Sequence, residues 1–257
     1  FRSKVSVIEM MPEILGVMDQ ELSRMLRTEY AKRGVVFYLD SKVTEVDEHQ
    51  VVIEKNGQTQ ALQTDRILVS VGRKPVVEGL GLETLDIRLF KNRVVVDAFM
   101  QTSCPRVYAS GDITGYSMLA HTAMREGEVV VNHLLGIDDR MSYAAIPSVV
   151  YTNPELAGVG KTEEELLAAG EHFQVLKLPM SYSGRFVAEN EQGNGLCKLI
   201  IDAGEHILGC HILGNPASEL IVIAGMAIEK QLTVDAFKRI VFPHPTVGEI
   251  IHEILDQ

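Results

Sequence analysis

The chain has 257 residues, of which 46% are hydrophobic, so it can bury a substantial core and is long enough for two domains. Its formal net charge is −11 and it contains no basic run, which argues against a nucleic-acid-binding surface. Charged residues interrupt each apolar stretch before it reaches about 18 residues, so no membrane span is predicted.

The three cysteines, Cys104, Cys197 and Cys210, lie far apart and form neither a C-x-x-C nor a zinc-ligand pattern. A low and odd cysteine count is typical of the reducing cytoplasm, which is the predicted location. We expect all three to be buried structural thiols. The eight histidines form no evident group of metal ligands either, so no metal site is predicted.

The N-terminal region has the composition of a buried strand almost from its first residue. The first residue is Phe1, and residues 4–9 (KVSVIE) already have the β-branched, apolar composition of a buried strand. Because native domains rarely begin inside a core element, we expect the chain to be the later part of a longer protein. Residues 19–33 then have helical spacing, Gly34 is placed to end the helix, and residues 35–39 form a second strand. This order predicts a βαβ unit with parallel strands.

The pattern then changes. From residue 43 to residue 65, apolar and polar side chains alternate, as in strands with one exposed face. The dipeptide Asn56-Gly57 in this stretch predicts a type I′ hairpin turn. The run RILVSVG, which ends at Gly72, predicts another buried strand, and Pro75 marks a domain edge.

The remainder of the chain is predicted to mix strands and helices. Residues 106–109 have the composition of a short strand that runs into a Ser-Gly-Asp turn ending at Asp112, and residues 119–135 have the spacing of a helix. From Tyr143 onward, strands precede helices as in an α+β module. Its predicted strands are 148–151, 173–178, 195–201 and 207–212, and its predicted helices are 162–169, 217–230, 233–240 and 246–255.

Two acidic residues end predicted strands, and each allows two interpretations. At the end of a strand in a βαβ unit, Glu9 can accept hydrogen bonds from the ribose of a dinucleotide, or it can be a solvated loop residue. As a ribose ligand it would repel a 2′-phosphate and so favour NAD over NADP. Just before a helix, Gly111 lets a ligand approach the backbone and Asp112 can accept from its hydroxyls. The alternative for Asp112 is an Asx-turn or a helix N-cap.

The C-terminal segment FPHPTVGEIIHEILDQ, residues 242–257, also allows two interpretations. Thr246 and Glu249 fit a capping box at the start of an amphipathic helix. In the other interpretation, His244 is a catalytic base that Glu249 orients. One apolar stripe is predicted to dock the helix on the core: Val247, Ile250, Ile251 and Ile254.

Five motifs resemble those of one enzyme family in their order and spacing. They are VGRKP at 71–75, SGD at 110–112, MLAHTAMREG at 118–127, TNPELAGVG at 152–160 and HPTVGE at 244–249. The resemblance is to the flavin-dependent pyridine nucleotide–disulfide oxidoreductases, and within them to the dihydrolipoamide dehydrogenase branch. It covers essentially all 257 residues, but only the later part of the family's chain.

The resemblance implies an α/β fold in which a partial Rossmann-like FAD/NAD(P)-binding domain is followed by an α+β dimerisation domain. Residues 1–75 are then the NAD-binding domain without its Gly-rich turn. Residues 76–142 are the second FAD-contacting segment, and residues 143–257 are the dimerisation domain.

In the family, the aspartate of the GD motif, here Asp112, hydrogen-bonds the ribityl chain of FAD. The helix that opens at the LAH segment points at the pyrimidine edge of the flavin, and its positive end would stabilise the charge that develops there on reduction. The residues implied to bind FAD and NAD are Glu9, Gly72, Asp112, Met118, Leu119, Ala120 and His121.

The terminal histidine of the family, here His244, exchanges a proton with the thiol substrate, and Glu249 orients its imidazole. We therefore expect Thr246 to cap the helix while Glu249 turns to the imidazole. The His–Pro bond is cis in the family, and the histidine serves the other subunit, which implies a homodimer. The implied reaction is oxidation of protein-bound dihydrolipoamide, with electrons passing through a disulfide and FAD to NAD⁺. The implied partner is the lipoyl-bearing subunit of a 2-oxo-acid dehydrogenase or glycine-cleavage complex.

The sequence also departs from the family. The first FAD segment, the redox-active C-x4-C pair and the Gly-rich turn of the NAD domain are missing, and Gly248 replaces the usual serine. We therefore expect this chain alone to be inactive and to bind FAD poorly. Two alternatives stay open. One is another NAD(P)H-dependent disulfide reductase or a flavin transhydrogenase; the other, for the isolated chain, is a non-enzymatic dimerisation module that folds from Tyr143 onward.

Overall fold

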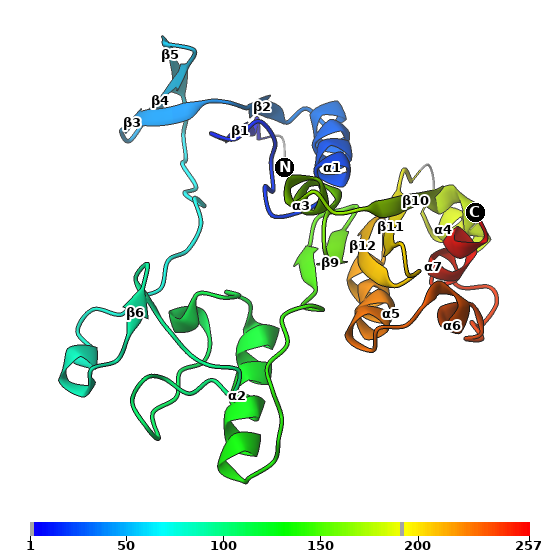
Figure 1. Cartoon of the computed structure of the whole chain (residues 1–257). Helices are drawn as coiled ribbons and strands as arrows, with labels where there is room; N and C mark the ends of the chain where they lie inside the picture. The colour runs from blue at the N-terminus through cyan, green and yellow to red at the C-terminus, as the bar shows by residue number, and fades with distance from the viewer. Residues whose placement is uncertain (1–2, 191–192) are drawn as a thin grey trace. The chain divides into compact units, whose positions relative to one another are not determined.

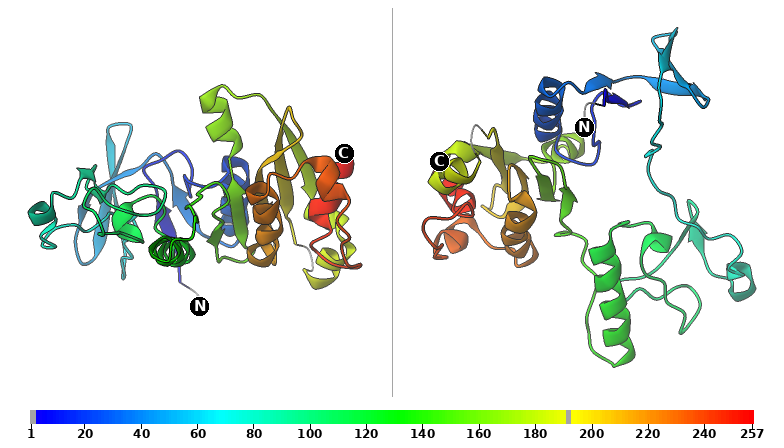
Figure 2. Two further views of the ribbon diagram at one scale, coloured as in Figure 1. Left: turned by 60° about the horizontal axis from the view of Figure 1, so that its bottom comes forward. Right: turned by 180° about the vertical axis from the view of Figure 1, so that it is seen from behind.

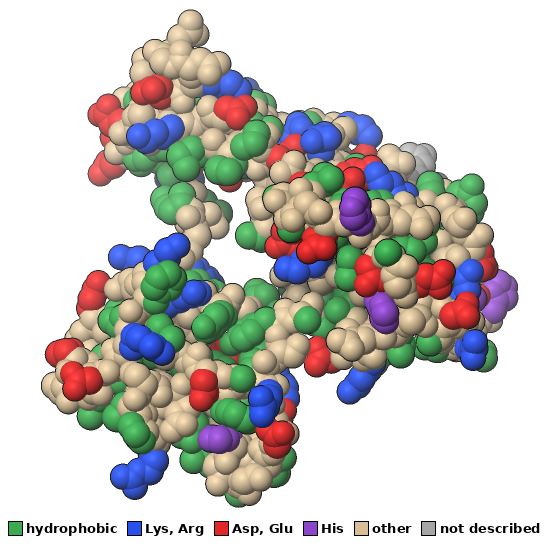
Figure 3. All heavy atoms as spheres, viewed as in Figure 1, with side chains coloured by type: hydrophobic (Ala, Val, Ile, Leu, Met, Phe, Trp, Pro, Cys, Tyr) green, Lys and Arg blue, Asp and Glu red, His purple; other side chains and the backbone are tan. Residues whose placement is uncertain are grey.

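The computed structural model describes residues 3–190 and 193–257, and the chain divides into two compact units. Unit 1 combines the chain up to Ile67 with Ala144–Gln257, whereas unit 2 is Leu68–Tyr143 (Figure 1 and Figure 2). The three sequence domains, with edges after residues 75 and 142, stay a prediction. Among the described helices, none has the length and apolar character needed to cross a membrane. On the face drawn in Figure 3, acidic and basic side chains are interspersed.

The first part of unit 1 is the predicted βαβ unit. Strand β1 (Ser6–Ile8) pairs in parallel with β2 (Val36–Tyr38), and helix α1 (Gln20–Lys32) connects them. Asp19 begins the helix because its Oδ1 accepts hydrogen bonds from two backbone N–H groups of the first turn, at 3.1 and 3.2 Å. Gly34, with a φ of +91°, follows the helix end as predicted.

An antiparallel region follows β2. Strands β3 (Lys42–Val46), β4 (Gln50–Lys55) and β5 (Gln58–Gln63) form a three-stranded sheet. The φ angles of Asn56 and Gly57 are +52° and +75°, the left-handed values that a type I′ turn needs at both positions. The predicted hairpin is confirmed.

Two predicted strands are wrong. Residues 66–72 belong to no strand, and Leu68 and Val71 are each 92% exposed. Residues 106–109 form only an isolated bridge, between Tyr108 and Gln101. An apolar run becomes a strand only where neighbouring strands supply hydrogen bonds to its edges, and none of the strands in the described ranges pairs with either segment.

Unit 2 contains one long helix. Helix α2 (Ala120–Leu134) begins and ends within one residue of the predicted bounds. A small hydrophobic core of Val77, Ile87 and Val94 holds the loops that precede it. The other regular elements of unit 2 are η1 (Leu82–Leu85), β6 (Leu89–Phe90), β7 (Arg93–Val94) and η2 (Asp112–Thr114).

The second part of unit 1 is a five-stranded antiparallel sheet with the order β10-β11-β12-β9-β8. Its strands are β8 (Ser148–Val150), β9 (Leu156–Gly160), β10 (Phe173–Pro179), β11 (Leu196–Asp202) and β12 (Ile207–Leu213). Its helical segments are α3 (Glu163–Ala169), η3 (Met180–Tyr182), α4 (Gly184–Glu189), α5 (Ala217–Glu229), α6 (Val234–Lys238), α7 (Ile250–Glu253) and η4 (Ile254–Asp256). The predicted α+β module is confirmed, although β9 and α4 were not predicted.

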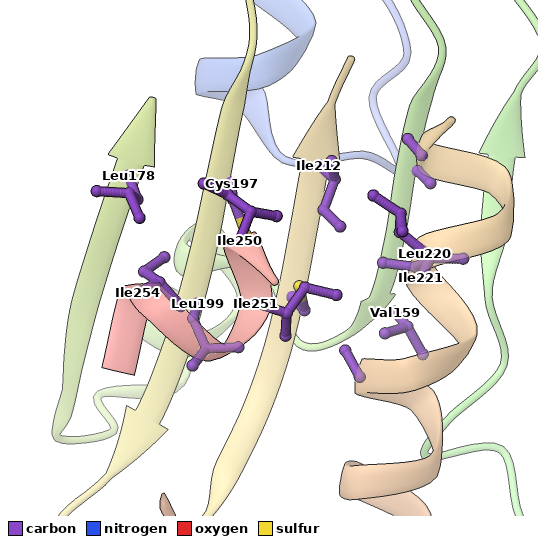
Figure 4. Close-up of a cluster of buried hydrophobic side chains, with 14 of the residues drawn as sticks. Val159, Leu178, Cys197, Leu199, Ile212, Leu220, Ile221, Ile250, Ile251 and Ile254 are labelled. Atoms are coloured by element: carbon purple, nitrogen blue, oxygen red, sulfur yellow. The ribbon is translucent and has the colours of Figure 1, made fainter. Parts of the chain in front are cut away.

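Helices α5 and α7 pack against one face of this sheet (Figure 4). Cys197 and Leu199 of β11 point into the core that they share. The stripe predicted to dock the C-terminal helix is buried, with exposed fractions of 6% for Val247 and 0% for Ile250, Ile251 and Ile254. Cys197 and Cys210 are buried as expected, whereas Cys104 is only partly buried.

On the other face of the sheet, β11 carries Lys198, whose side chain is fully buried. Its Nζ atom lies 2.6 Å from Oδ2 of Asp19, 3.2 Å from Oε2 of Glu21 and 2.5 Å from Oε2 of Glu163. Burial opposes the charge, but the hydrogen bonds to Asp19 and Glu163 hold the pKa of Lys198 above its ordinary value. These four residues, the Lys198 cluster, join α1 and α3 to the sheet.

We expect Lys198→Met to lower the free energy of unfolding by about 3–5 kcal/mol, because it leaves the buried carboxylate of Asp19 without its cation. The matched control is Lys177→Met, since Lys177 is 41% exposed and contacts the same cluster through Glu21. That variant should lose about 1 kcal/mol or less. Urea unfolding followed by circular dichroism measures both free energies. Equal losses would contradict the conclusion that the buried Lys198 stabilises the fold more than the exposed Lys177 does.

Candidate active site

His244 and Glu249 form a pair in the turn before α7. The Nδ1 atom of His244 lies 3.0 Å from Oε1 of Glu249, and the His244–Pro245 peptide bond is cis. The imidazole is 82% exposed, whereas Glu249 is only 18% exposed. The structure therefore brings the two predicted catalytic side chains together and leaves the ring accessible.

The expected helix cap at Thr246 is wrong. The Oγ1 atom of Thr246 donates to the carbonyl of Pro243 at 2.9 Å, and Oε2 of Glu249 accepts from the backbone N–H of Thr246 at 2.7 Å. Helix α7 begins only at Ile250. Glu249 thus serves the imidazole with one oxygen and the backbone with the other, because the tight turn places both donors on its carboxylate.

These two donors set the charge of Glu249. The N–H of Thr246, and then the imidazole of His244, hold the pKa of Glu249 below its ordinary value. Because an ionised carboxylate only accepts hydrogen bonds, we assign the proton in this contact to Nδ1 of the imidazole. The Nε2 atom of the neutral ring is then the acceptor, so the pair can take a proton from a donor placed at Nε2.

Glu9 directly follows β1, at the carboxyl end of a parallel strand. Its backbone N–H donates to the carbonyl of Tyr38 at 2.9 Å, and its Oε1 accepts from the N–H of Met11 at 2.9 Å. The side chain is partly exposed. Glu9 therefore supports its own turn through Oε1, and the second oxygen of the carboxylate can accept from a ribose hydroxyl.

Asp112 opens the turn η2, directly after Gly111. Gly111 has φ and ψ of +82° and −157°, and it occupies the N-cap position of η2, so the N-cap interpretation of Asp112 is wrong. Asp112 is 48% exposed, and its Oδ2 lies 3.6 Å from Nη1 of Arg73. Gly72, the neighbour of Arg73, has a φ of +104°. The VGRKP and SGD motifs therefore meet in unit 2.

The segment from Met118 to His121 leads into α2. Leu119 occupies the N-cap position with an extended backbone and has no polar side chain with which to cap the helix. Met118 is partly buried, whereas Ala120 and His121 are exposed. A helix start of this kind presents backbone N–H groups and the positive end of the dipole to an approaching negative charge.

These residues fit a flavin by their chemistry. Unit 2 offers a carboxylate for ribityl hydroxyls at Asp112, a glycine that permits close approach at Gly111, and the open start of α2. In the part of the chain that the structure describes, no group of three or more metal-ligating side chains occurs. Sequence reasoning missed Arg73 and Glu126, which contact the Asp112 turn; their only signal was their presence in the VGRKP and MLAHTAMREG motifs.

Two models of the pyridine nucleotide-disulphide oxidoreductase family match the chain, one over residues 1–127 and one, for the dimerisation domain, over residues 146–255. The dihydrolipoyl dehydrogenase of Thermus scotoductus is 39% identical over 98% of this chain and 56% of its own length. Dihydrolipoyl dehydrogenase 3 of Pseudomonas putida is 36% identical over 98% of this chain and 55% of its own length. The chain thus spans about half the length of these curated relatives.

Solved structures have the same fold. LpdA from Mycobacterium tuberculosis matches with a TM-score of 0.87 at 26% identity, over 98% of this chain and 56% of that chain. The Cu(II) complex of RclA, an HOCl-induced flavoprotein disulfide reductase from Escherichia coli, matches with a TM-score of 0.85 at 26% identity, over 100% of this chain and 59% of that chain. The predicted α/β fold with a dimerisation domain is confirmed, and the chain belongs to the pyridine nucleotide-disulphide oxidoreductase family.

Proposed function

We propose that the chain is part of an FAD-containing, NAD-linked dihydrolipoyl dehydrogenase, in which His244 and Glu249 are the catalytic pair. The observation that carries the proposal is the 3.0 Å contact between His244 and Glu249, inside the region that matches the dimerisation domain. The names of the similar curated proteins support the substrate class. The reaction is oxidation of dihydrolipoamide coupled to reduction of NAD⁺.

His244 acts as the acid–base group. Because Glu249 holds Nδ1–H, Nε2 accepts the proton of a substrate thiol and leaves a thiolate, the nucleophile of thiol–disulfide exchange. The ionised Glu249 stabilises the imidazolium that forms. Bound FAD supplies the redox chemistry between the disulfide and NAD⁺. Asp112 would accept hydrogen bonds from the ribityl hydroxyls of FAD, and the Met118–His121 segment would bind its isoalloxazine part.

The proposed assembly is a homodimer, which the match to a dimerisation domain supports. In it, His244 serves the flavin and disulfide of the other subunit. The proposed partner is the lipoyl-bearing subunit of a 2-oxo-acid dehydrogenase or glycine-cleavage complex. The proposed location is the cytoplasm, because the cysteines are free thiols, which a reducing compartment maintains.

A flavoprotein disulfide reductase with another substrate is the second candidate, because RclA matches the whole chain with a TM-score of 0.85. For the isolated chain, the alternative is a dimerisation module without enzymatic activity, because the five-stranded sheet has its own hydrophobic core. The visible flavin absorbance of the purified chain tests the dimerisation module. A yellow protein contradicts the inactive module, and a colourless dimer supports it.

We expect His244→Gln in the flavin-loaded enzyme to lower turnover with dihydrolipoamide about 10²–10⁴-fold, the usual effect of losing a general acid–base group. Flavin content should be unchanged, because the proposed FAD contacts lie in unit 2. The matched control is His172→Gln, an exposed histidine of the same domain. Steady-state kinetics decide the question, and unchanged turnover would remove His244 from the mechanism.

We expect Glu249→Gln to lower turnover about tenfold or more, because a neutral amide does not stabilise the imidazolium as a carboxylate does. The pKa of Glu249 lies below its ordinary value, so its charge is present above that value and is lost as the pH falls through the lowered pKa. The difference from the unaltered enzyme should therefore hold from about pH 5 upward and shrink below it. Glu253→Gln, at an exposed position of α7, is the control for the pH profile. A difference in turnover that stays constant at all pH values would contradict the role assigned to the charge of Glu249.

We expect Glu9→Gln to weaken NAD⁺ binding about tenfold or more, because the ribose loses a charged acceptor. The preference for NAD⁺ over NADP⁺ should also fall, since the carboxylate no longer repels the 2′-phosphate. Glu48→Gln, at an exposed position between β3 and β4, is the matched control. Calorimetric titration with both nucleotides measures the effect. Equal affinities in the two variants would show that Glu9 supports only its own turn and does not bind the ribose.

A further inference from the structure

Glu126 is a fully buried carboxylate that the proposed chemistry leaves unused. It lies in the middle of α2, and its two oxygens have different partners. Oε2 accepts a hydrogen bond from the backbone N–H of Gly111 at 2.5 Å, and Oε1 accepts from the hydroxyl of Tyr143 at 2.7 Å. A buried carboxylate is very unfavourable without such donors, so these two bonds hold three separate segments of unit 2 in one arrangement.

The first bond anchors the turn that carries Asp112. Gly111 has a positive φ of +82°, and a Cβ atom at this position would lie 3.4 Å from Cβ of Ala123 on α2. Without a side chain, Gly111 cannot anchor itself to the helix, and the Glu126 carboxylate does so through the backbone N–H. Because Asp112 is the next residue, the direction of its side chain depends on this anchor.

The second bond reaches the end of unit 2. Tyr143 is its last residue, and Ala144 begins the return of the chain to unit 1. The ring of Tyr143 stacks on Tyr116 with 5.2 Å between centroids, and the guanidinium of Arg93 lies 4.7 Å from the Tyr116 ring centroid. Burial, and then the hydrogen bond to Glu126, raise the pKa of Tyr143, so the phenol keeps the proton that it donates.

We propose that Glu126 is a positioning residue, which holds Asp112 for the ribityl chain of the flavin and couples this contact to the segment that enters the dimerisation domain. The inference rests on the proposed function, because Asp112 has this role only if a flavin binds to unit 2. Glu126 itself has no exposed surface with which to touch a ligand, so it acts through Gly111.

The anchor is tested first without flavin. In the purified chain, Glu126→Gln should speed hydrogen exchange at the Gly111 amide about tenfold or more, because the amide loses a charged acceptor. The matched control is Glu128→Gln, a glutamate of the same helix that is 65% exposed, and it should leave this exchange unchanged. An unchanged exchange rate of the Gly111 amide in Glu126→Gln would show that Glu126 does not anchor the turn.

The positioning role is tested by a double-mutant cycle on the flavin dissociation constant. Glu126→Gln and Asp112→Asn should each raise it about tenfold, and the double variant should bind no more weakly than Asp112→Asn alone. A purely structural role for Glu126 gives additive losses instead, and additive losses would overturn the proposal.

Tyr143→Phe is the second variant, for the case in which Glu126→Gln does not fold. It removes one donor and keeps the bond between Glu126 and Gly111, so we expect a loss of flavin affinity smaller than that of Glu126→Gln. An unchanged flavin affinity in Tyr143→Phe would overturn the coupling to the linker. These flavin measurements use the intact enzyme of which the chain is proposed to be part, because the chain alone is expected to bind FAD poorly. If that enzyme takes up no flavin, the proposed function fails and the positioning role with it. Flavin binding with additive losses overturns the positioning role alone.

Discussion

The buried ammonium of Lys198 is the interaction on which unit 1 depends. A charge without exposed surface is tolerated only beside its counter-ions, and Asp19 is the one counter-ion that is itself fully buried. The same carboxylate has a second role, because its Oδ1 caps α1 while its Oδ2 contacts the cation. Helix α1 lies in the region of the first family match and β11 in that of the second. The Lys198 cluster therefore joins the region of the first family match to that of the second, and Asp19, which begins α1, is held by a residue of the sheet.

The local features of the fold could be predicted from the sequence, and the features that depend on distant pairing could not. Asn56 and Gly57 determine their own turn, because both backbones must be left-handed and these residue types tolerate that. Strand β9 was not predicted, because it contains two glycines and glycine is more typical of turns than of strands. The reason for Gly158 is non-local: a Cβ atom there would lie 2.7 Å from Nδ1 of His211 on the neighbouring strand. Residues 66–72 show the converse, since an apolar run alone does not provide the neighbours of a strand.

The contacts of the candidate site also divide into local ones, which the sequence predicts, and distant ones, which it does not. His244 and Glu249 were predicted as a pair because they stand in one motif, five positions apart. The contacts of Arg73 with Asp112 and of Glu126 with Gly111 join different motifs, so no spacing in the sequence indicates them. The bond from the backbone N–H of Thr246 to Glu249 is the largest cause of the lowered pKa of Glu249. It belongs to the capping-box interpretation, whereas the expectation that Glu249 turns to the imidazole left it out. A backbone donor outside such a pattern, like the N–H of Gly111, leaves no signal in the side chains, because every residue except proline carries one.

Burial separates the carboxylates that hold the structure from those available to ligands. Glu126 and Asp19 have no exposed surface, and each is bound by donors from different segments, so neither can be given up to a ligand without loss of structure. Asp112 is instead half exposed, and its partner Arg73 is 74% exposed at 3.6 Å. Such a pair contributes about 1 kcal/mol at most, so a ligand hydroxyl can replace the guanidinium at little cost. The buried Glu126 fixes the turn, and the loosely paired Asp112 on that turn stays available for a ligand.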